Sequence, residues 1–324
     1  MDTRFRGYDN TMELKPTPTR DGFGEEITTL GRTNKDIVVV SGDLEDATRA
    51  EYFKKEFPER FFNLGITEQD VVGTAAGLST QGYVAFATSF AVFLTNRAYD
   101  MIRLDVCYNN CNVKVVCSHG GVTVGEDGAS AQCLEDFAIM RVLPNMKVIC
   151  PADYIEAKKA TRAITKTSGP FYMRTSRAPL PIITKEEDAF TIGKANVLRQ
   201  GKDATIIACG VMVAEALSAA EKLSAEGIQV KVLNMHTIKP IDAEAIMAAA
   251  KETGAIVTAE EHQMAGGLGS AVAEVLVQHT PVPVEIVGVK DSFGESGTPA
   301  QLQAHYGLKD VNIVEAVKKV VKRK

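Results

Sequence analysis

Short apolar runs alternate with helix-like segments along almost the whole 324-residue chain. Runs such as 37–40 and 113–117 end at turn residues and are typical of buried strands. Between such runs, segments such as 68–80 and 153–166 have the pattern of helices. A regular alternation of this kind predicts an α/β fold, in which a mainly parallel sheet is covered by helices on both faces.

The proline-containing segment 177–181 interrupts the alternation, which then resumes. Because the length also favours two domains, we expect two doubly wound units. The predicted division is an N-terminal arm at 1–18, a first domain at 19–180, a linker at 181–192 and a second domain at 193–324. The expected strands are 37–40, 83–87, 113–117, 147–150, 171–174, 204–209, 228–233, 255–259 and 284–287. The expected helices are 22–30, 68–80, 91–108, 131–141, 153–166, 211–226, 242–252, 267–279 and 311–322.

Composition excludes several classes of function. The net charge is -5, and the only basic stretch, 318–324, is expected to be the solvated end of a helix, so we expect no nucleic-acid partner. None of the six cysteines forms a Cys-x-x-Cys pair, which favours buried thiols in a reducing compartment. The first residues lack the apolar core of a signal peptide, and no stretch approaches the length of a membrane span. We therefore expect a cytoplasmic chain with no membrane association.

Polar side chains follow the predicted strands of the first domain. In open α/β sheets, ligands bind at the carboxyl ends of strands. We expect the residues at these ends to cluster around a ligand: Asp43, Glu68, Ser89, His119, Arg174 and Arg177.

Glu68 opens a helix of small residues. Thr67 is its predicted N-cap, and Asp70 three residues later completes a capping-box pattern. A carboxylate in a first turn is ordinarily explained by the helix dipole, which is worth about 0.3–1 kcal/mol. However, Gly73 and Gly77 leave one face of this helix bare, although each glycine costs about 1 kcal/mol relative to alanine. This pattern favours close packing against another helix, which would bury Glu68 and shift its proton affinity.

Three further features leave two interpretations open. Phe90 and Phe93 lie on one helical face and form either core or a wall for a flat ring. The glycine-rich loop 118–128 is either a flexible surface loop or a site for a polyol and phosphate. Three arginines at segment ends could bind phosphate, although isolated arginines are usually solvated: Arg20, Arg174 and Arg177.

Together these segments resemble transketolase, specifically its pyrimidine-binding and C-terminal domains, from about Arg20 onward. Motifs in matching order and spacing carry the resemblance: 65–69 (GITEQ), 88–93 (TSFAVF), His119 with 125–128 (GEDG), and Ser176-Arg177. The segments 259–263 (AEEHQ) and 266–269 (GGLG) are similar to the C-terminal domain.

The resemblance assigns the coenzyme contacts residue by residue. Glu68 matches the glutamate that hydrogen-bonds the aminopyrimidine ring of thiamine diphosphate and promotes loss of a proton from the reactive carbon. Phe90 and Phe93 match the aromatic wall of the pyrimidine pocket. Asp43 and Leu44 match a turn that reaches the coenzyme across the subunit boundary.

The resemblance also assigns the sugar contacts. Asp127 matches a contact to a hydroxyl group of the donor sugar. His119, Arg20 and Arg177 match groups that bind the sugar phosphate, and His119 is also expected to act in catalysis.

Two positions depart from the family pattern. Ala131 stands where a histidine is usual, and Ala47 stands where a phosphate-binding serine is usual, with Thr48 beside it as a substitute. These departures imply donor recognition and phosphate geometry that differ from the family pattern, and they are consistent with an unusual ketose substrate.

The Gly-Asp-Gly motif that binds the diphosphate and its metal does not occur in the sequence. We therefore expect the chain to be the C-terminal subunit of a split transketolase and to hold no metal itself. A separate N-terminal subunit would hold the diphosphate with Mg²⁺ or Ca²⁺, and the two chains would form a heterotetramer around a homodimer. This enzyme would move a two-carbon ketol unit from a ketose phosphate to an aldose phosphate.

Three alternatives remain. The β subunit of a 2-oxoacid dehydrogenase shares the architecture and the glutamate, but 125–128 and Arg177 favour transketolase. Deoxyxylulose-phosphate synthase has a run similar to 97–100 (RAYD), but it carries its own diphosphate domain. A non-catalytic interaction module would not be expected to retain Glu68 with both phenylalanines.

Overall fold

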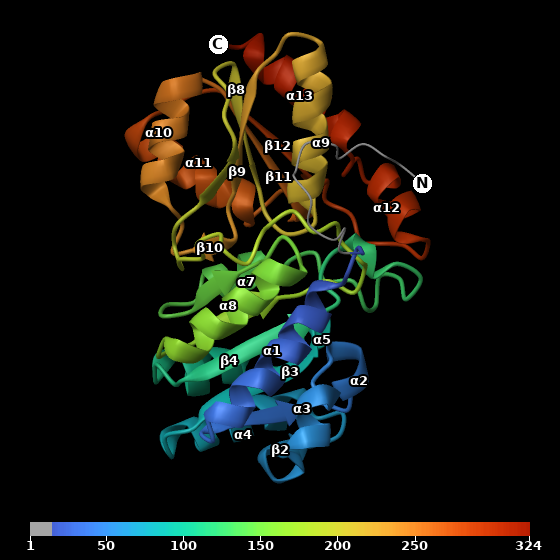
Figure 1. Ribbon diagram of the computed structural model, residues 1–324, viewed down its shortest axis with the longest axis vertical. Coiled ribbons are helices and arrows are strands. Elements are labelled where there is room, and N and C mark those ends of the chain that lie inside the picture. The colour runs from blue at the N-terminus through green and yellow to red at the C-terminus, as the bar shows by residue number, and fades with distance from the viewer. Residues whose placement is uncertain (1–14) are drawn as a thin grey trace.

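The computed structural model describes residues 15–324, so most of the expected arm at 1–18 lies outside the described residues. The described chain forms two α/β lobes, one from its first half and one from its second (Figure 1). Each lobe is built on one sheet with helices on both faces, and both sheets are mainly parallel, as the alternation predicts.

The first sheet has the strand order β10-β5-β6-β4-β3-β1-β2. All neighbouring strands are parallel except β10, which runs antiparallel to β5. The strands are β1 (Ile37–Ser41), β2 (Phe61–Asn63), β3 (Val84–Phe90), β4 (Val113–Ser118), β5 (Lys147–Ile149), β6 (Phe171–Arg174) and β10 (Thr237–Lys239).

Alternation along each strand separates two apolar cores. In β1, Ile37 and Val39 pack with α1, α3 and α8, whereas Val38 and Val40 pack with α4 and α5. This period of two is the normal consequence of strand geometry. The helical segments of this lobe are α1 (Thr19–Thr33), α2 (Glu45–Thr48), α3 (Glu51–Glu56), η1 (Pro58–Arg60), α4 (Glu68–Thr80), α5 (Ala91–Arg97), α6 (Tyr99–Met101), η2 (Ile102–Tyr108), η3 (Val122–Val124), α7 (Asp136–Arg141) and α8 (Tyr154–Lys166).

The second sheet has the strand order β12-β11-β8-β9-β7, with only β7 antiparallel to its neighbour. Helices α9 and α13 pack on one face, and α10 and α11 on the other. The strands are β7 (Asn196–Arg199), β8 (Ala204–Ala208), β9 (Val230–Asn234), β11 (Ile256–Gln263) and β12 (Val284–Val289). The helices are α9 (Met212–Ala225), α10 (Ala243–Thr253), α11 (Leu268–His279), α12 (Pro299–His305) and α13 (Asp310–Val321).

The two lobes share structure. Strand β10 belongs to the second half of the chain but pairs with β5 of the first sheet. Cys150 at the end of β5 and Cys209 at the end of β8 lie in one continuous apolar core. The relative position of the two sheets is therefore fixed by hydrogen bonds and by buried side chains.

Several local expectations were wrong. The predicted helix 91–108 is interrupted at Ala98 and continues as the short helix α6 and then as π-helical turns, and the predicted helix 131–141 begins only at Asp136. The expected capping box at α4 does not form, because the Thr67 hydroxyl donates to the Leu64 carbonyl at 2.9 Å. Strands β2, β7 and β10 and helix α12 were not predicted, since short segments depend on tertiary pairing.

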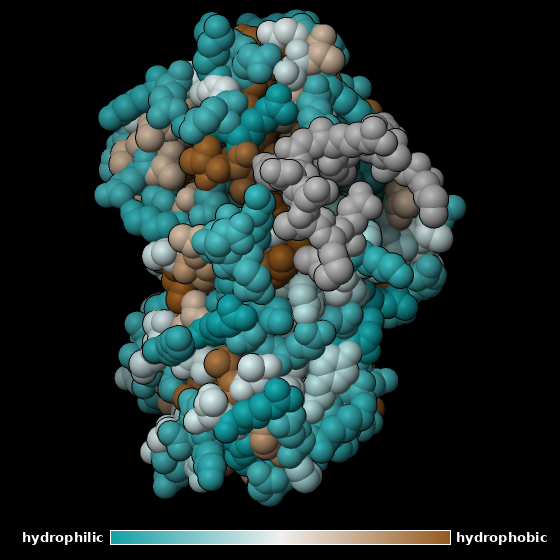
Figure 2. All heavy atoms as spheres, in the orientation of Figure 1, coloured by the Kyte–Doolittle hydropathy of each residue, from teal (hydrophilic) through white to brown (hydrophobic). Residues whose placement is uncertain are grey.

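On the face shown in Figure 2, hydrophilic residues cover most of the surface, and apolar residues form small separate patches. Within residues 15–324, no helix combines the length and apolarity needed to cross a membrane.

Candidate active site

The carboxyl ends of five neighbouring strands form one edge of the first sheet. Along the order β6-β4-β3-β1-β2, these ends lead into or contain Arg177, His119, Phe90, Asp43 and Glu68. Contacts described below connect most of these side chains. The topology therefore places these five residues along the same edge of the sheet.

Glu68 is the first residue of α4, and its side chain is 6% exposed. Its Oε1 accepts a hydrogen bond from Nη1 of Arg97 at 2.7 Å, and the Arg97 side chain is 53% exposed. Among described residues, no other hydrogen bond to the Glu68 side chain is formed. The nearly buried carboxylate is thus held by one partner whose side chain faces solvent.

Sequence reasoning did not identify Arg97. Its position offers a signal, because it follows Phe93 by four residues in α5, and such pairs share a helix face. The guanidinium lies 4.5 Å from the centroid of the Phe93 ring, so the helix spacing is used for stacking.

Planar groups form a continuous stack along this edge. Arg97 lies over Phe93, whose centroid is 5.5 Å from that of Phe90, with the rings inclined by 16°. Phe90 in turn stacks on His119 at 3.7 Å and 15°. The two phenylalanines therefore belong to the edge of the site and not to the central core, and their arrangement suits contact with a flat heteroaromatic ring.

His119 occupies a constrained position at the end of β4. Its φ is 62°, its side chain is buried, and its Nδ1 lies 2.7 Å from Oγ of Ser118. Burial, and then the charges of Arg20, Arg177 and Arg49, lower the pKa of His119 to about 3. The imidazole is therefore neutral at physiological pH and can accept or donate one hydrogen bond.

Three arginines give this region a positive potential. Arg20 donates from Nη1 to the Ala47 carbonyl at 2.8 Å, and its buried Nε has no hydrogen-bond partner within residues 15–324. Burial and the neighbouring charges of Arg49 and Arg177 lower the pKa of Arg20. Guanidinium groups clustered beside a neutral histidine are suited to binding an oxyanion such as phosphate.

Arg177 connects this cluster to the glycine-rich loop. Its Nη1 donates to the Val124 carbonyl and lies 3.5 Å from Glu126 and 3.4 Å from Asp127. The Asp127 side chain is 36% exposed. Asp127 is therefore oriented by Arg177 and remains accessible to a polar ligand.

The remaining predicted residues divide into two groups. Leu44 packs with Phe90 and Phe93, and Asp43 is exposed and accepts from Nδ2 of Asn63 at 3.2 Å. By contrast, the Thr48 side chain is buried, and its hydroxyl donates to the Leu44 carbonyl at 2.9 Å. Thr48 does not present its hydroxyl to the site as the sequence analysis suggested.

Arg174 also differs from its expected role. It lies beneath the site, where its side chain is 5% exposed and its Nε is 3.4 Å from Oδ2 of Asp136. Burial is outweighed by the charges of Asp136 and Glu261, and these raise the pKa of Arg174. Arg174 is a structural cation between the lobes and is not available to phosphate.

Within the described residues, no three His, Cys, Asp or Glu side chains converge to form a metal site.

Comparison with known proteins gives a consistent result. The model of the transketolase pyrimidine-binding domain matches residues 15–182, and the model of the transketolase C-terminal domain matches residues 193–313. A transketolase C-terminal section from Methanocaldococcus jannaschii is 45% identical over 94% of this chain and 96% of its own length. The 6-deoxy-6-sulfo-D-fructose transketolase subunit SqwH from Clostridium sp. is 42% identical over 97% of each chain.

Among solved structures, a split-gene transketolase in an inactive β4 tetramer is 47% identical, with a TM-score of 0.89. The match covers 95% of this chain and 99% of that chain. Because a family model spans more than half of the chain and relatives of matching length exceed 40% identity, the chain belongs to the transketolase family.

Proposed function

We propose that this chain is the C-terminal subunit of a two-chain, thiamine-diphosphate-dependent transketolase. In this function it moves a two-carbon ketol unit from a ketose phosphate to an aldose phosphate, together with a separate subunit. The observation that carries the proposal is Glu68, a nearly buried carboxylate that opens onto the same edge as the Phe90–Phe93 stack.

The residues present fit the pyrimidine end of the coenzyme. A glutamate with one solvent-facing partner can exchange Arg97 for a ring nitrogen, or bind the nitrogen with its second oxygen. Phe90 and Phe93 supply an aromatic apolar surface for such a ring once Arg97 leaves the outer face of Phe93. Thiamine diphosphate, when bound, supplies the carbon nucleophile that carries the ketol unit.

Each side chain at the edge has a defined task in this proposal. Glu68 holds a proton at the ring nitrogen, and its burial keeps competing water away. His119 is neutral and offers one hydrogen bond to a sugar oxygen. Arg20 and Arg177 bind the sugar phosphate, and Asp127 accepts a hydrogen bond from a donor hydroxyl group.

The proposal requires a partner to hold the diphosphate with Mg²⁺ or Ca²⁺. One face of α4 fits a docking surface, because a Cβ added at Gly73 or at Gly77 would meet nothing within 4 Å. The chain itself therefore gives no packing reason for two glycines that each cost about 1 kcal/mol in a helix. Ile66, 73% exposed just before α4, is a further apolar contact for a second chain. The relatives described as a subunit and as a split-gene protein support a two-chain enzyme. The arrangement that we propose is a homodimer of this chain inside a heterotetramer.

The substrate is proposed to be an unusual ketose phosphate or a related anion. Ala131 is buried in the small apolar cluster with Phe90, and Ala47 packs against the same cluster. Neither methyl group can form a hydrogen bond with a sugar hydroxyl, so recognition depends on the remaining polar groups. The Clostridium relative, whose name specifies a sulfonated fructose, supports an anionic ketose outside the common set.

Reconstitution tests this function. The native chain is purified with its companion, and ketol transfer is measured for the chain alone, the companion alone and the mixture, with thiamine diphosphate and Mg²⁺. We expect transfer only in the mixture. Turnover by the purified single chain would refute the split arrangement, and no turnover by the mixture with phosphorylated or sulfonated ketoses would refute the function.

A further inference from the structure

The glycine-rich loop that carries His119 and Asp127 is fixed from behind by the second lobe. The carboxylate of Glu261 in β11 accepts two hydrogen bonds from Thr123, one from the backbone N–H to Oε1 and one from the hydroxyl to Oε2 at 3.1 Å. Glu261 lies in a strand of the C-terminal domain, and its side chain is buried. One side chain thus joins the second sheet to a loop of the first.

The fit between this carboxylate and the loop leaves no spare space. Gly121 has a φ of 86°, and a Cβ built on it would overlap the carboxylate of Glu261. A Cβ built on Gly120 would overlap the guanidinium of Arg174. The two consecutive glycines therefore let the loop backbone lie directly on a buried acid and a buried base.

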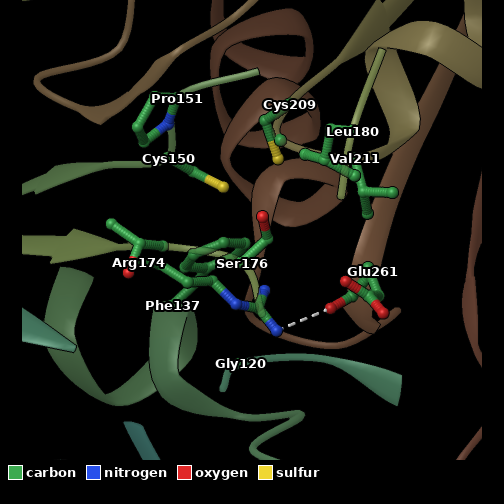
Figure 3. Close-up of a pocket in the computed structure, with 12 residues that line it drawn as sticks. Gly120, Phe137, Cys150, Pro151, Arg174, Ser176, Leu180, Cys209, Val211 and Glu261 are labelled. Carbon is green, nitrogen blue, oxygen red and sulfur yellow. Dashed lines mark hydrogen bonds between the residues drawn. The ribbon is translucent and has the colours of Figure 1, made fainter. Parts of the chain in front are cut away.

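Arg174 also connects the start of this loop, at Gly120 and Gly121, to both lobes. Its Nη2 donates to the main-chain oxygens of Cys133 and Glu261, each at 3.0 Å. Figure 3 shows Arg174 reaching towards Glu261 beside Gly120, with the Glu261 contact drawn as a dashed line. Gly121 N–H donates to the Cys133 carbonyl at 2.7 Å, so the start of the loop is also held.

The rest of the loop is covered by the same lobe. Val122 belongs to the apolar core that contains α9 and α13. Gln132 donates from Nε2 to the carbonyls of Gly125 at 3.2 Å and Glu295 at 2.9 Å. The front of the loop faces the proposed substrate, and its back is part of the C-terminal domain.

We infer that Glu261 is a positioning residue for ketol transfer: it holds Thr123 so that His119 and Asp127, on either side, face the sugar. This inference rests on the proposed function and deepens it, because it gives the C-terminal domain a direct role at the substrate loop. Glu261 acts through Thr123 and does not touch the substrate.

The neighbouring residue provides a matched control. Glu260 is equally buried in β11, but its carboxylate accepts from the N–H groups of Leu268 and Gly269 at 2.6 and 2.8 Å. It therefore stabilises the start of α11 and makes no hydrogen bond to the loop. Glu260→Gln replaces a buried carboxyl group in the same strand without altering the Thr123 contact.

Hydrogen–deuterium exchange of the full chain is the first test. We expect Glu261→Ala to increase exchange in peptides covering 119–128 at least tenfold, Glu261→Gln to stay near the wild type, and Glu260→Gln to affect only peptides at the start of α11. If Glu261→Ala does not fold, Thr123→Val removes the hydroxyl donor alone and should increase loop exchange by a smaller factor. Unchanged loop exchange in a folded Glu261→Ala or Thr123→Val variant would overturn the inference, as would equal loosening by Glu260→Gln.

Kinetics of the reconstituted enzyme are the second test. Glu261→Ala should raise the KM for the sugar phosphate at least tenfold while the concentration of thiamine diphosphate needed for half activation changes less than twofold. Equal effects on sugar and coenzyme would indicate a general loss of structure and would overturn the positioning role. If the wild-type pair shows no ketol transfer, the proposed function fails, whereas the exchange experiment still judges the Glu261–Thr123 contact.

Discussion

Glu68 and Glu261 are both buried glutamates beside an arginine, yet their surroundings differ in kind. Glu68 meets one guanidinium, that of Arg97, whose side chain is more than half exposed. Glu261 accepts two hydrogen bonds from Thr123 and lies beside Arg174, which is almost completely buried. A carboxylate whose one hydrogen-bond partner within residues 15–324 faces solvent can change partners during a reaction, whereas one with a hydrogen bond to each oxygen fixes geometry. The comparison distinguishes Glu68, a candidate for the chemistry, from Glu261, a scaffold group that holds the structure of the same site.

The pKa of Glu261 reflects its burial at the junction of the lobes. Burial raises it to about 7, although the charge of Arg174 and the hydrogen bonds from Thr123 act in the opposite direction. A similar group, Glu156, lies at the junction of the lobes, and its pKa is also raised to about 7, mainly by burial. The junction therefore contains acids that lower stability when they ionise.

The largest effect is expected from Glu68→Gln in the reconstituted enzyme. The amide keeps the size of the side chain but cannot hold the proton that the ring nitrogen needs. Activity should fall at least 100-fold, about 2.7 kcal/mol, with an unchanged circular dichroism spectrum.

Asp70→Asn is the matched control for Glu68→Gln, because Asp70 is an exposed acid in the same first turn of α4. Its activity should stay within twofold of the wild type. If Glu68→Gln lowered the activity by less than tenfold, Glu68 would have no part in the chemistry. Glu68 and Glu261 would then not differ in role.

An intermediate effect is expected for Glu156→Gln on stability. Glu156 accepts from the Ala152 N–H at 2.7 Å and from Nδ2 of Asn234 at 2.8 Å, while Oδ1 of Asn234 has no partner within residues 15–324. The side chain of a glutamine at this position can accept a hydrogen bond from the Ala152 N–H. It can also donate one to Oδ1 of Asn234 after the side-chain amide of Asn234 flips. The flip changes which Asn234 atom lacks a partner, Nδ2 in place of Oδ1, so the substitution removes a titrating charge without adding an unpaired polar atom.

The sign of the pH effect follows from the raised pKa. The folded state binds the Glu156 proton more tightly than the unfolded state does. The stabilisation of the folded state by protonated Glu156 is therefore complete below pH 4.5 and is lost as the pH rises through about 7. The shift corresponds to roughly 3 kcal/mol at most. We expect the free energy of unfolding of the variant, relative to that of the wild type, to increase by about 2 kcal/mol as the pH rises from 5 to 8, measured by urea unfolding.

One control variant and one shared background effect matter for the outcome of that experiment. Glu187→Gln changes the net charge equally at an exposed position and should show no such gain. Buried His119 and His236, whose pKa values are lowered by burial to about 3 and about 4, reduce stability as pH falls below 6.5, but they are common to both proteins and cancel. A flat difference between pH 5 and pH 8 would show that the junction admits enough water to solvate Glu156.

Much of this arrangement could be predicted from the sequence because it depends on local patterns. Each strand of four or more residues in the first sheet has its own apolar run, so the parallel direction of the sheet and the position of His119 at a strand end followed directly. Glu68 follows the short strand β2, which was not predicted, and its place was expected from the helix that it opens. The orientation of Thr48 did not follow, since its hydroxyl bonds within its own helix. The contacts of Arg97 with Glu68 and of Glu261 with Thr123 join residues 29 and 138 positions apart, and no local pattern specifies such pairs.

The smallest effect is expected from Arg97→Met. Methionine retains the apolar stem over Phe93 and removes the charge beside Glu68. Because the guanidinium is mostly in solvent, the lost pair should cost about 0.2–1 kcal/mol of stability, and ketol transfer should change by threefold or less. Arg97→Lys keeps the charge and controls for the change of shape. A stability loss of about 3 kcal/mol, measured by urea unfolding, would mean that Glu68 depends on Arg97 as a buried pair does. Glu68 would then belong with Glu261 as a scaffold group, and its exchange of partners during the reaction would be excluded.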